Sequence, residues 1–290
     1  MPTESMARDR VALAEPVRRV GVVTMLGRFA NRHIAPISLV ILLVVLEFVC
    51  DWMKVPEYIL PAPSRIIQSL IAGFWTPLGS RNGFYIHLAA TSVSAAASFV
   101  GGSLFGIVMG FLVVRSAFAK RLIYPYVVSL QSVPKVALAP LFTVWFGLGY
   151  ESKVVLGILL CFFPVLINTA AGLGSVDRDR LDLMAAMKAS AWHTFRFVQL
   201  PSALPYIFAG LELAAISAVL GTVVGEFVGG DRGLGVLILN RNAALDIPGA
   251  MAALVVLAVM GIVVQTAVST LRRKMLFWAP SERVADKAAH

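Results

Sequence analysis

Three charged residues lie in stretches that are otherwise apolar, and they are the first candidates for chemistry. Lys135 lies between Pro134 and Pro140, while Glu212 and Glu226 lie within one apolar run. An isolated charge in an apolar environment is costly, so such residues usually have a functional or a pairing role. We expect these three residues and the two prolines, Pro134 and Pro140, to line or gate a pathway through the protein.

Lys135 has three open interpretations. It forms an ion pair with Glu212, or it contacts an anionic substrate in a pathway, or its ammonium group reaches back to a membrane surface. The flanking prolines predict a broken helix here, whose freed carbonyl groups face a cavity.

Glu226 has two open interpretations. It acts as a gate at the end of its apolar run, or it has a structural role in which it caps the following turn, Gly229–Gly235, or pairs with Arg232. That glycine-rich turn has no Lys-Ser or Lys-Thr after it and is not a phosphate-binding loop.

No sequence pattern for catalysis is present. The chain has no G-x-x-x-x-G-K-[ST], H-E-x-x-H or G-x-S-x-G motif and no cluster of His and Cys. The two cysteines, Cys50 and Cys161, lie in apolar stretches and predict no disulfide. We therefore expect no catalytic residue, no metal site, no cofactor and no ATP site in this polypeptide.

The composition is that of a membrane protein. Of 290 residues, 58% are hydrophobic and 14% are charged, whereas soluble domains have roughly 25% charged residues. The net charge is +9, but charges are too sparse to form a nucleic-acid-binding face.

Six apolar runs are long enough to cross a bilayer as helices, because about 20 residues suffice and only helices satisfy their backbone in lipid without closing a barrel. We predict an all-α, polytopic protein with the spans Ile34–Cys50, Asn82–Val114, Leu122–Gly147, Val154–Gly174, Leu204–Val228 and Pro248–Leu271.

The basic residues predict the orientation. Eighteen Lys and Arg fall before the first span, after the sixth span and in the links after the second and fourth spans, against six in the other links. Basic residues accumulate on the cytoplasmic side, so both termini are expected there. We divide the chain into a basic N-terminal tail, 1–33, a transmembrane domain, 34–275, and a C-terminal tail, 276–290. Within the N-terminal tail, Val17–Phe29 has two open interpretations, an interfacial helix on the inner leaflet or a frayed basic tail.

Two segments outside the spans have helical character. Ile59–Ser64 contains two prolines and predicts extended backbone, and Ser64 is expected to cap a short amphipathic helix, Arg65–Phe74. The cytoplasmic link Asp182–Pro201 predicts an amphipathic helix that Leu200-Pro201 ends. Its apolar face requires a partner, which is the lipid surface, the rest of this chain or another protein.

This cytoplasmic link resembles the EAA motif of ABC importer permeases, roughly E-A-A-x3-G-x9-I-x-L-P. In the preferred register Asp182 is at the Glu position, Lys188 at the Gly position and Val198 at the Ile position. A rival register uses Met184-Ala185-Ala186 and Ser190, but it leaves Leu-Pro two residues short. The residues expected to couple to an ATPase are Asp182, Met184, Lys188, Ser190, Trp192, Phe195, Leu200 and Pro201.

The resemblance extends over roughly residues 59–275. Ser132–Pro140, Trp145–Gly149 and Phe163–Thr169 are similar to the third and fourth spans of the nitrate/sulfonate/taurine branch of these permeases, and Gly225-Glu226-Phe227 with Gly233-Leu234-Gly235 to the fifth span and its loop. Lys188 replaces the family's Gly, so we expect a milder turn there or a turn shifted to Ser190.

The resemblance implies a permease of the type I ABC importer fold with a cytoplasmic coupling helix, in a bacterial inner membrane. Its implied partners are a second copy of the permease, two ATPase subunits and an extracytoplasmic solute-binding protein, which Glu226 could contact. The implied substrate is a small organic or inorganic anion, or alternatively a thiamine-precursor pyrimidine or a flavin. An ATP-independent secondary transporter is the rival from another class.

Overall fold

The structure is a computed structural model that describes residues 22–278, all of whose regular elements are helical. It divides into two units, Met1–Val55 and Pro56–His290. The described part of the first unit is mostly one helix, α1 (Val22–Trp52). This helix contains the first predicted span and runs through the predicted boundary between residues 33 and 34. Part of the predicted interfacial helix lies outside the described residues, and the rest belongs to α1.

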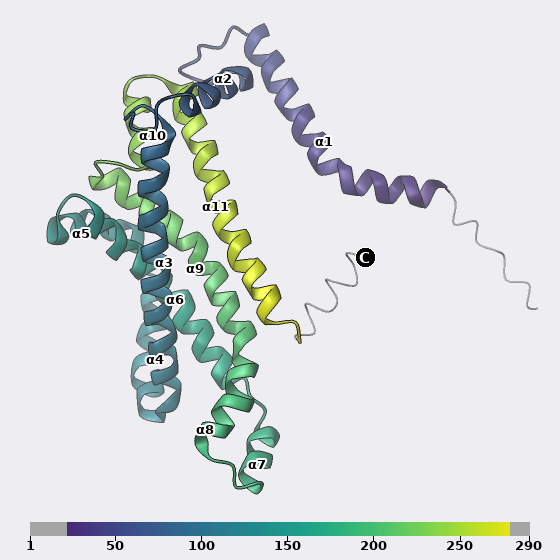
Figure 1. The fold of residues 1–290 in the computed structure, drawn as a ribbon, viewed down its shortest axis with the longest axis vertical. Coiled ribbons are helices and arrows are strands. Elements are labelled where there is room, and N and C mark those ends of the chain that lie inside the picture. The colour runs from purple at the N-terminus through teal and green to yellow at the C-terminus, as the bar shows by residue number, and fades with distance from the viewer. Residues whose placement is uncertain (1–21, 279–290) are drawn as a thin grey trace, which may run out of the picture. The chain divides into compact units, whose positions relative to one another are not determined.

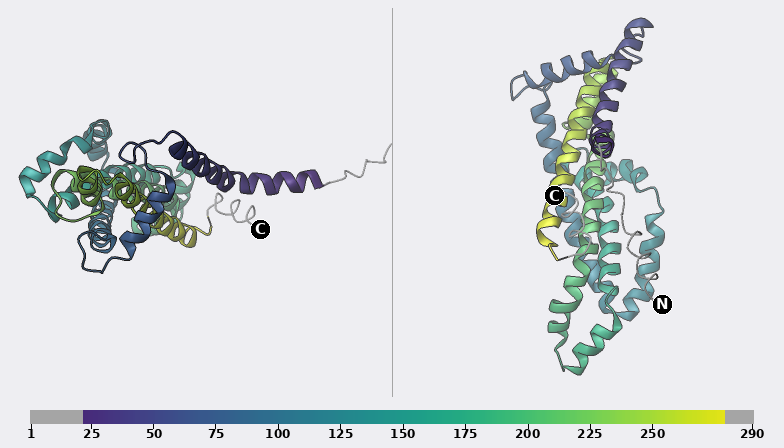
Figure 2. Two further views of the ribbon diagram at one scale, coloured as in Figure 1. Left: turned by 90° about the horizontal axis from the view of Figure 1, so that it is seen from above. Right: turned by 90° about the vertical axis from the view of Figure 1, so that its right-hand side faces the viewer.

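The second unit is a bundle of long helices (Figure 1). Helix α6 (Tyr150–Gly174) packs against both α3 (Phe84–Arg115) and α9 (Leu200–Gly229), and α11 (Ile247–Met275) packs against α9 and α3. The two further views in Figure 2 show the same bundle. Leu276, which the sequence assigns to the C-terminal tail, is buried against Phe208 of α9.

Small residues bring α3 and α6 together. Gly102, Gly106 and Gly110 face α6, and a Cβ added at these positions would lie 2.5–2.8 Å from the Cβ atoms of its side chains. Only glycine permits that approach, so the three glycines form a packing seam, as small residues at helical spacing predict for membrane helices.

Two pairs of short helices lie at the two ends of the bundle (Figure 1). We call one the α2–α10 end, after α2 (Pro63–Phe74) and α10 (Leu234–Ala243). The other is the α7–α8 end, with α7 (Arg178–Ala186) and α8 (Ala191–Thr194). Helix α2 confirms the predicted amphipathic helix, but its N-cap is Ala62, and Ser64 lies inside the first turn.

The third predicted span is broken rather than continuous. Helix α4 (Ala117–Gln131) is followed by a turn, the short helix η1 (Lys135–Leu138) and α5 (Ala139–Phe146). The segments before and after the turn are bent by 88°. Pro134 precedes η1 and Pro140 lies in the first turn of α5, so the two prolines interrupt the helix, as the sequence predicts.

Among the described residues, four helical segments are long and apolar enough to cross a membrane, or five if the bent pair counts as one span. The four are Phe84–Arg115, Tyr150–Gly174, Ala191–Gly229 and Ile247–Met275. The predicted count of six, which also needs Ile34–Cys50 of α1, therefore stays a prediction.

Candidate functional site

The predicted coupling segment is not one amphipathic helix. Helix α7 ends at Ala186, and Lys188 takes a left-handed conformation with φ 53°. The chain then continues through α8 and the π-helical segment η2 (Phe195–Gln199) directly into α9. The segment is therefore a short helix, a turn and an extension of the fifth predicted span.

The expectation that Leu200-Pro201 ends a helix is wrong. The Leu200 N–H donates to the Phe195 carbonyl, five residues back, in the wider spacing of a π-helix. Pro201 has no N–H to donate. The π-helical turn changes the spacing of the hydrogen bonds just before Pro201, where a donor is missing. The helix therefore continues past the proline.

The expectation of a milder or shifted turn at Lys188 is also wrong. The left-handed residue is Lys188 itself, at the position where the preferred register places Gly. Ser190 instead caps α8, because its Oγ accepts the His193 N–H. A left-handed conformation costs a non-glycine residue roughly 1–2 kcal/mol, so the surrounding structure holds Lys188 there.

Four large apolar side chains are exposed around this turn. Leu183, Met187, Trp192 and Phe197 are each 60–69% exposed. Leu183 and Phe197 line a recess of about 400 Å³ between α7 and the start of α9, together with Met184 and Pro201. The α7–α8 end thus presents an apolar surface that the described chain does not cover.

Phe195 differs from these four. Its ring packs edge-on against Phe111 at 5.1 Å, and it contacts the core cluster of Leu173, Ala203 and Ile207. Trp192 lies beside it, with the ring centroids 5.7 Å apart, but stays mostly exposed. Of the two aromatic residues expected to couple to an ATPase, only Trp192 offers a partner a large exposed surface.

Lys135 and Glu212 do not form the ion pair that was one of the three interpretations of Lys135. Glu212 of α9 pairs with Arg272 of α11 at 3.0 Å. The Lys135 ammonium donates to the Gln131 carbonyl at 2.8 Å and lies 5.0 Å from the centre of the Phe163 ring. It thus covers the end of α4 at the bend, and no carboxylate in the described residues pairs with it.

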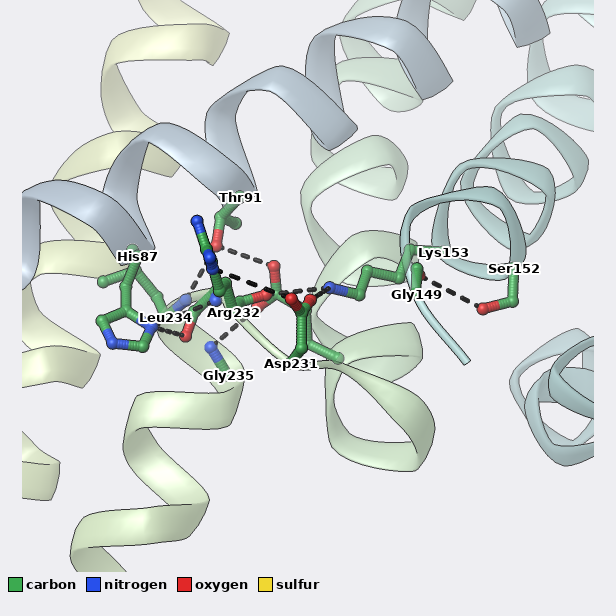
Figure 3. A network of polar contacts seen from close by, with 11 residues as sticks. His87, Thr91, Gly149, Ser152, Lys153, Asp231, Arg232, Leu234 and Gly235 are labelled. Atoms are coloured by element: carbon green, nitrogen blue, oxygen red, sulfur yellow. Dashed lines mark hydrogen bonds and ion pairs between the residues drawn. The ribbon is translucent and has the colours of Figure 1, made fainter. Parts of the chain in front are cut away.

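Glu226 is the centre of a buried polar network at the α2–α10 end. Figure 3 labels Thr91 and Gly235, which bind its carboxylate. Glu226 is 2% exposed and accepts hydrogen bonds from Thr91 Oγ1 of α3 and from the Gly235 N–H, each at 2.8 Å. The proposed role as a cap of the following turn is confirmed, whereas Arg232 instead faces Asp231 at 3.7 Å.

Two residues of α3 complete the cap of α10. Thr91 Oγ1 accepts the Leu234 N–H at 2.8 Å. His87 Nδ1 contacts the Gly233 backbone, 3.1 Å from its nitrogen and 2.8 Å from its oxygen, while Nε2 lies 2.8 Å from the Arg81 carbonyl. The first N–H groups of α10, which lack partners in the helix, are thus satisfied by side chains of α3 and α9.

Lys153 of α6 supplies a positive charge to this network. Its side chain is buried, and its ammonium donates to the Arg232 carbonyl at 2.8 Å. The same ammonium lies 4.0 Å from Asp231. The network therefore joins α3, α6, α9 and α10.

Sequence reasoning missed His87, Thr91 and Lys153. The first two are four residues apart in an apolar run, which places them on one helical face, and this spacing was the available signal. Nothing in the sequence indicates that Lys153 is buried. The described residues contain no group of His, Cys, Asp and Glu that could hold a metal ion.

Residues 102–276 match the family described as "Binding-protein-dependent transport system inner membrane component". The chain is 34% identical to the formylaminopyrimidine transport permease protein ThiX of Halalkalibacterium halodurans, over 76% of this chain and 86% of that protein. It is 33% identical to the riboflavin transport system permease protein RibX of Chloroflexus aurantiacus, over 92% of this chain and 98% of that protein. Further relatives are named as permeases for aliphatic sulfonates, taurine and nitrate.

The fold also matches solved structures. The inward-facing MetNI methionine ABC transporter contains a chain that superposes with a TM-score of 0.54 at 22% identity, over 67% of this chain and 98% of that one. At that identity the likeness concerns the fold, which is that of an ABC importer permease.

Proposed function

Since this chain belongs to the binding-protein-dependent transport inner membrane components and is an ABC importer permease, we propose that its α7–α8 end is where a separate ATPase subunit docks. Two copies form the translocation pathway in a bacterial inner membrane, with both termini cytoplasmic. An extracytoplasmic solute-binding protein delivers substrate at the α2–α10 end. ATP-driven closure of two ATPase subunits moves the α7–α8 segment and shifts the pathway between outward and inward access.

One observation carries this assignment. The turn at Lys188 exposes Leu183, Met187, Trp192 and Phe197, although the neighbouring Phe195 packs inside the bundle. Trp192 and Phe197 precede the fifth predicted span, Leu204–Val228. Exposed aromatic side chains beyond the end of a span favour a protein interface, where such anchors dominate the binding energy. The continuous helix from α8 into α9 would transmit a displacement of this segment to the fifth predicted span.

The test is Trp192→Ala in membranes. Insertion is expected to be normal, whereas ATPase co-purification and ATP-dependent uptake fall, because a buried aromatic anchor contributes about 2 kcal/mol or more. Trp145→Ala is the matched control, since Trp145 of α5 is equally exposed, at 64%. Full ATPase binding and unchanged uptake in Trp192→Ala would show that this segment is not the coupling element.

The proposed substrate class is a small anion such as a sulfonate, taurine or nitrate. The exposed bend at Lys135 supports it, because its ammonium lacks a carboxylate partner in the described chain. The alternative is a thiamine-precursor pyrimidine or a flavin, which the names of two relatives of at least 33% identity favour.

Competition for uptake separates these substrates. Taurine, an alkanesulfonate, nitrate, formylaminopyrimidine and riboflavin are added in excess to cells that take up a labelled member of the set. If the substrate is an anion that Lys135 contacts, Lys135→Met lowers uptake about tenfold without loss of folded protein, and Lys135→Arg retains uptake. Uptake that survives deletion of the ATPase subunit would indicate a secondary transporter instead.

A further inference from the structure

A polar recess of about 450 Å³ opens at the α2–α10 end and belongs to neither the coupling segment nor the buried network. Its walls come from α2 with the loop after it, and from α10. Most of the side chains that line it are polar or charged: Ser69, Thr76, Arg81, Asn82, Asn240, Arg241 and Asp246.

The charge of the recess is not balanced. Arg241 is largely buried, and its guanidinium already has partners within the chain. It donates to the Asn82 carbonyl at 2.9 Å, lies 3.8 Å from Asp246 and covers the Phe84 ring at 5.3 Å. Asp246, the one carboxylate in the lining, also caps α11 through the Gly249 N–H. Arg81 is exposed, and its guanidinium has no hydrogen-bond or ion-pair partner in the described part of the chain.

The walls of the recess are held rigidly. The backbone of Arg81 is fixed through its carbonyl by His87, and the start of α10 by Thr91 and Glu226. A rigid surface with a free guanidinium and adjacent amide and hydroxyl groups suits a carboxylate, which accepts several hydrogen bonds at once. Preorganisation of this kind lowers the cost of binding.

We propose that this recess receives an acidic side chain of the extracytoplasmic binding protein, with Arg81 as the contacting cation and Asn240 beside it. The inference rests on the proposed function, which places the α2–α10 end outside. It adds a specific contact: the binding protein presents an Asp or Glu to the space between α2 and α10.

The experiment uses the reconstituted permease–ATPase complex and purified candidate binding proteins, each tested first for stimulation of the wild-type complex. Arg81→Gln is expected to weaken binding-protein affinity about fivefold, the upper range for one exposed charge pair. Arg81→Glu and Asn240→Asp, which place a negative charge in the recess, should weaken it further and lower stimulated ATPase. Basal ATPase and assembly of the complex should not change.

Arg65→Gln is the matched control, since Arg65 is an exposed arginine of α2 that pairs with Glu57 and does not line the recess. Changing the acidic residues of the binding protein singly to Lys should identify one that restores binding to Arg81→Glu. Wild-type affinity in Arg81→Glu would overturn the inference while leaving the proposed function intact. A wild-type complex that no binding protein stimulates would overturn both.

Discussion

Single polar side chains decide the geometry of the α2–α10 end. Thr91 uses one hydroxyl group twice, as a donor to Glu226 and as an acceptor from Leu234. Gly233 is required beside them, because its φ is 140° and a Cβ there would overlap the Glu226 carboxylate. A buried carboxylate in a membrane protein therefore has a plain structural role here, in holding the first turn of α10.

Thr91→Val is predicted to destabilise the protein. The change keeps the shape but leaves the buried Leu234 N–H and one Glu226 oxygen without a partner, which costs about 1–3 kcal/mol. Thermal unfolding in detergent measures this. Ser217→Ala is the matched control, because that exposed hydroxyl only bonds to Leu213 of its own helix, and the expected change is within about 0.5 kcal/mol. Equal effects of the two variants would contradict the capping role.

Residue pairing was the least predictable feature. Lys135 and Glu212 were matched because both are charges within apolar runs, but sequence gives no rotation of one helix relative to another. Arg272, the partner of Glu212, comes directly after the last predicted span, Pro248–Leu271, whereas α11 continues past it to Met275. An arginine in the last turn of a long helix can thus reach a carboxylate that apolarity alone would place in the membrane.

A double-mutant cycle tests the separation of Lys135 from Glu212. Because they have different partners, the effects of Lys135→Met and Glu212→Gln on unfolding should add within about 0.5 kcal/mol. Glu212→Gln and Arg272→Gln, in contrast, should be coupled, and by more than that amount. If the effects of Lys135→Met and Glu212→Gln on unfolding were not additive, the ion-pair interpretation of Lys135 and Glu212 would be supported after all.

The positions of whole helices were predicted better than the pairing of individual side chains. Spans α3, α6 and α11 follow from apolar runs, and the break in the third span follows from Pro134 and Pro140. The coupling segment was wrong in detail because its apolar spacing suits one helix, whereas a left-handed Lys188 and a π-helical turn divide it. Both features depend on tertiary support, which no local pattern encodes.

The α3–α6 seam gives a prediction at this scale. Gly106→Ala would place a Cβ 2.8 Å from Val165 Cβ and 2.9 Å from the Phe162 carbonyl oxygen. Because α3 and α6 cannot move apart freely, this overpacking should lower the free energy of unfolding by about 1–3 kcal/mol. Gly261→Ala in α11 is the control, because nothing lies within 4 Å of its added Cβ. Unfolding measurements that rank Gly261→Ala as the worse variant would contradict the seam.

For the whole molecule, orientation connects the two ends to their proposed partners. The coupling surface at the α7–α8 end and the charged recess at the α2–α10 end lie at opposite ends of the bundle (Figure 1). They can serve an ATPase and an extracytoplasmic binding protein only if the first end is cytoplasmic. The excess of Lys and Arg in the tails and in the links at the α7–α8 end supports that orientation.

Cysteine labelling with a membrane-impermeant reagent tests this orientation. Asp231→Cys should react in intact cells and Ser190→Cys only after lysis, because both positions are exposed but lie at opposite ends of the bundle. The native Cys50 and Cys161 are both buried and should give little background. Reaction of Ser190→Cys in intact cells would reverse the orientation. The α7–α8 surface would then face away from ATP, and neither proposed interface could stand.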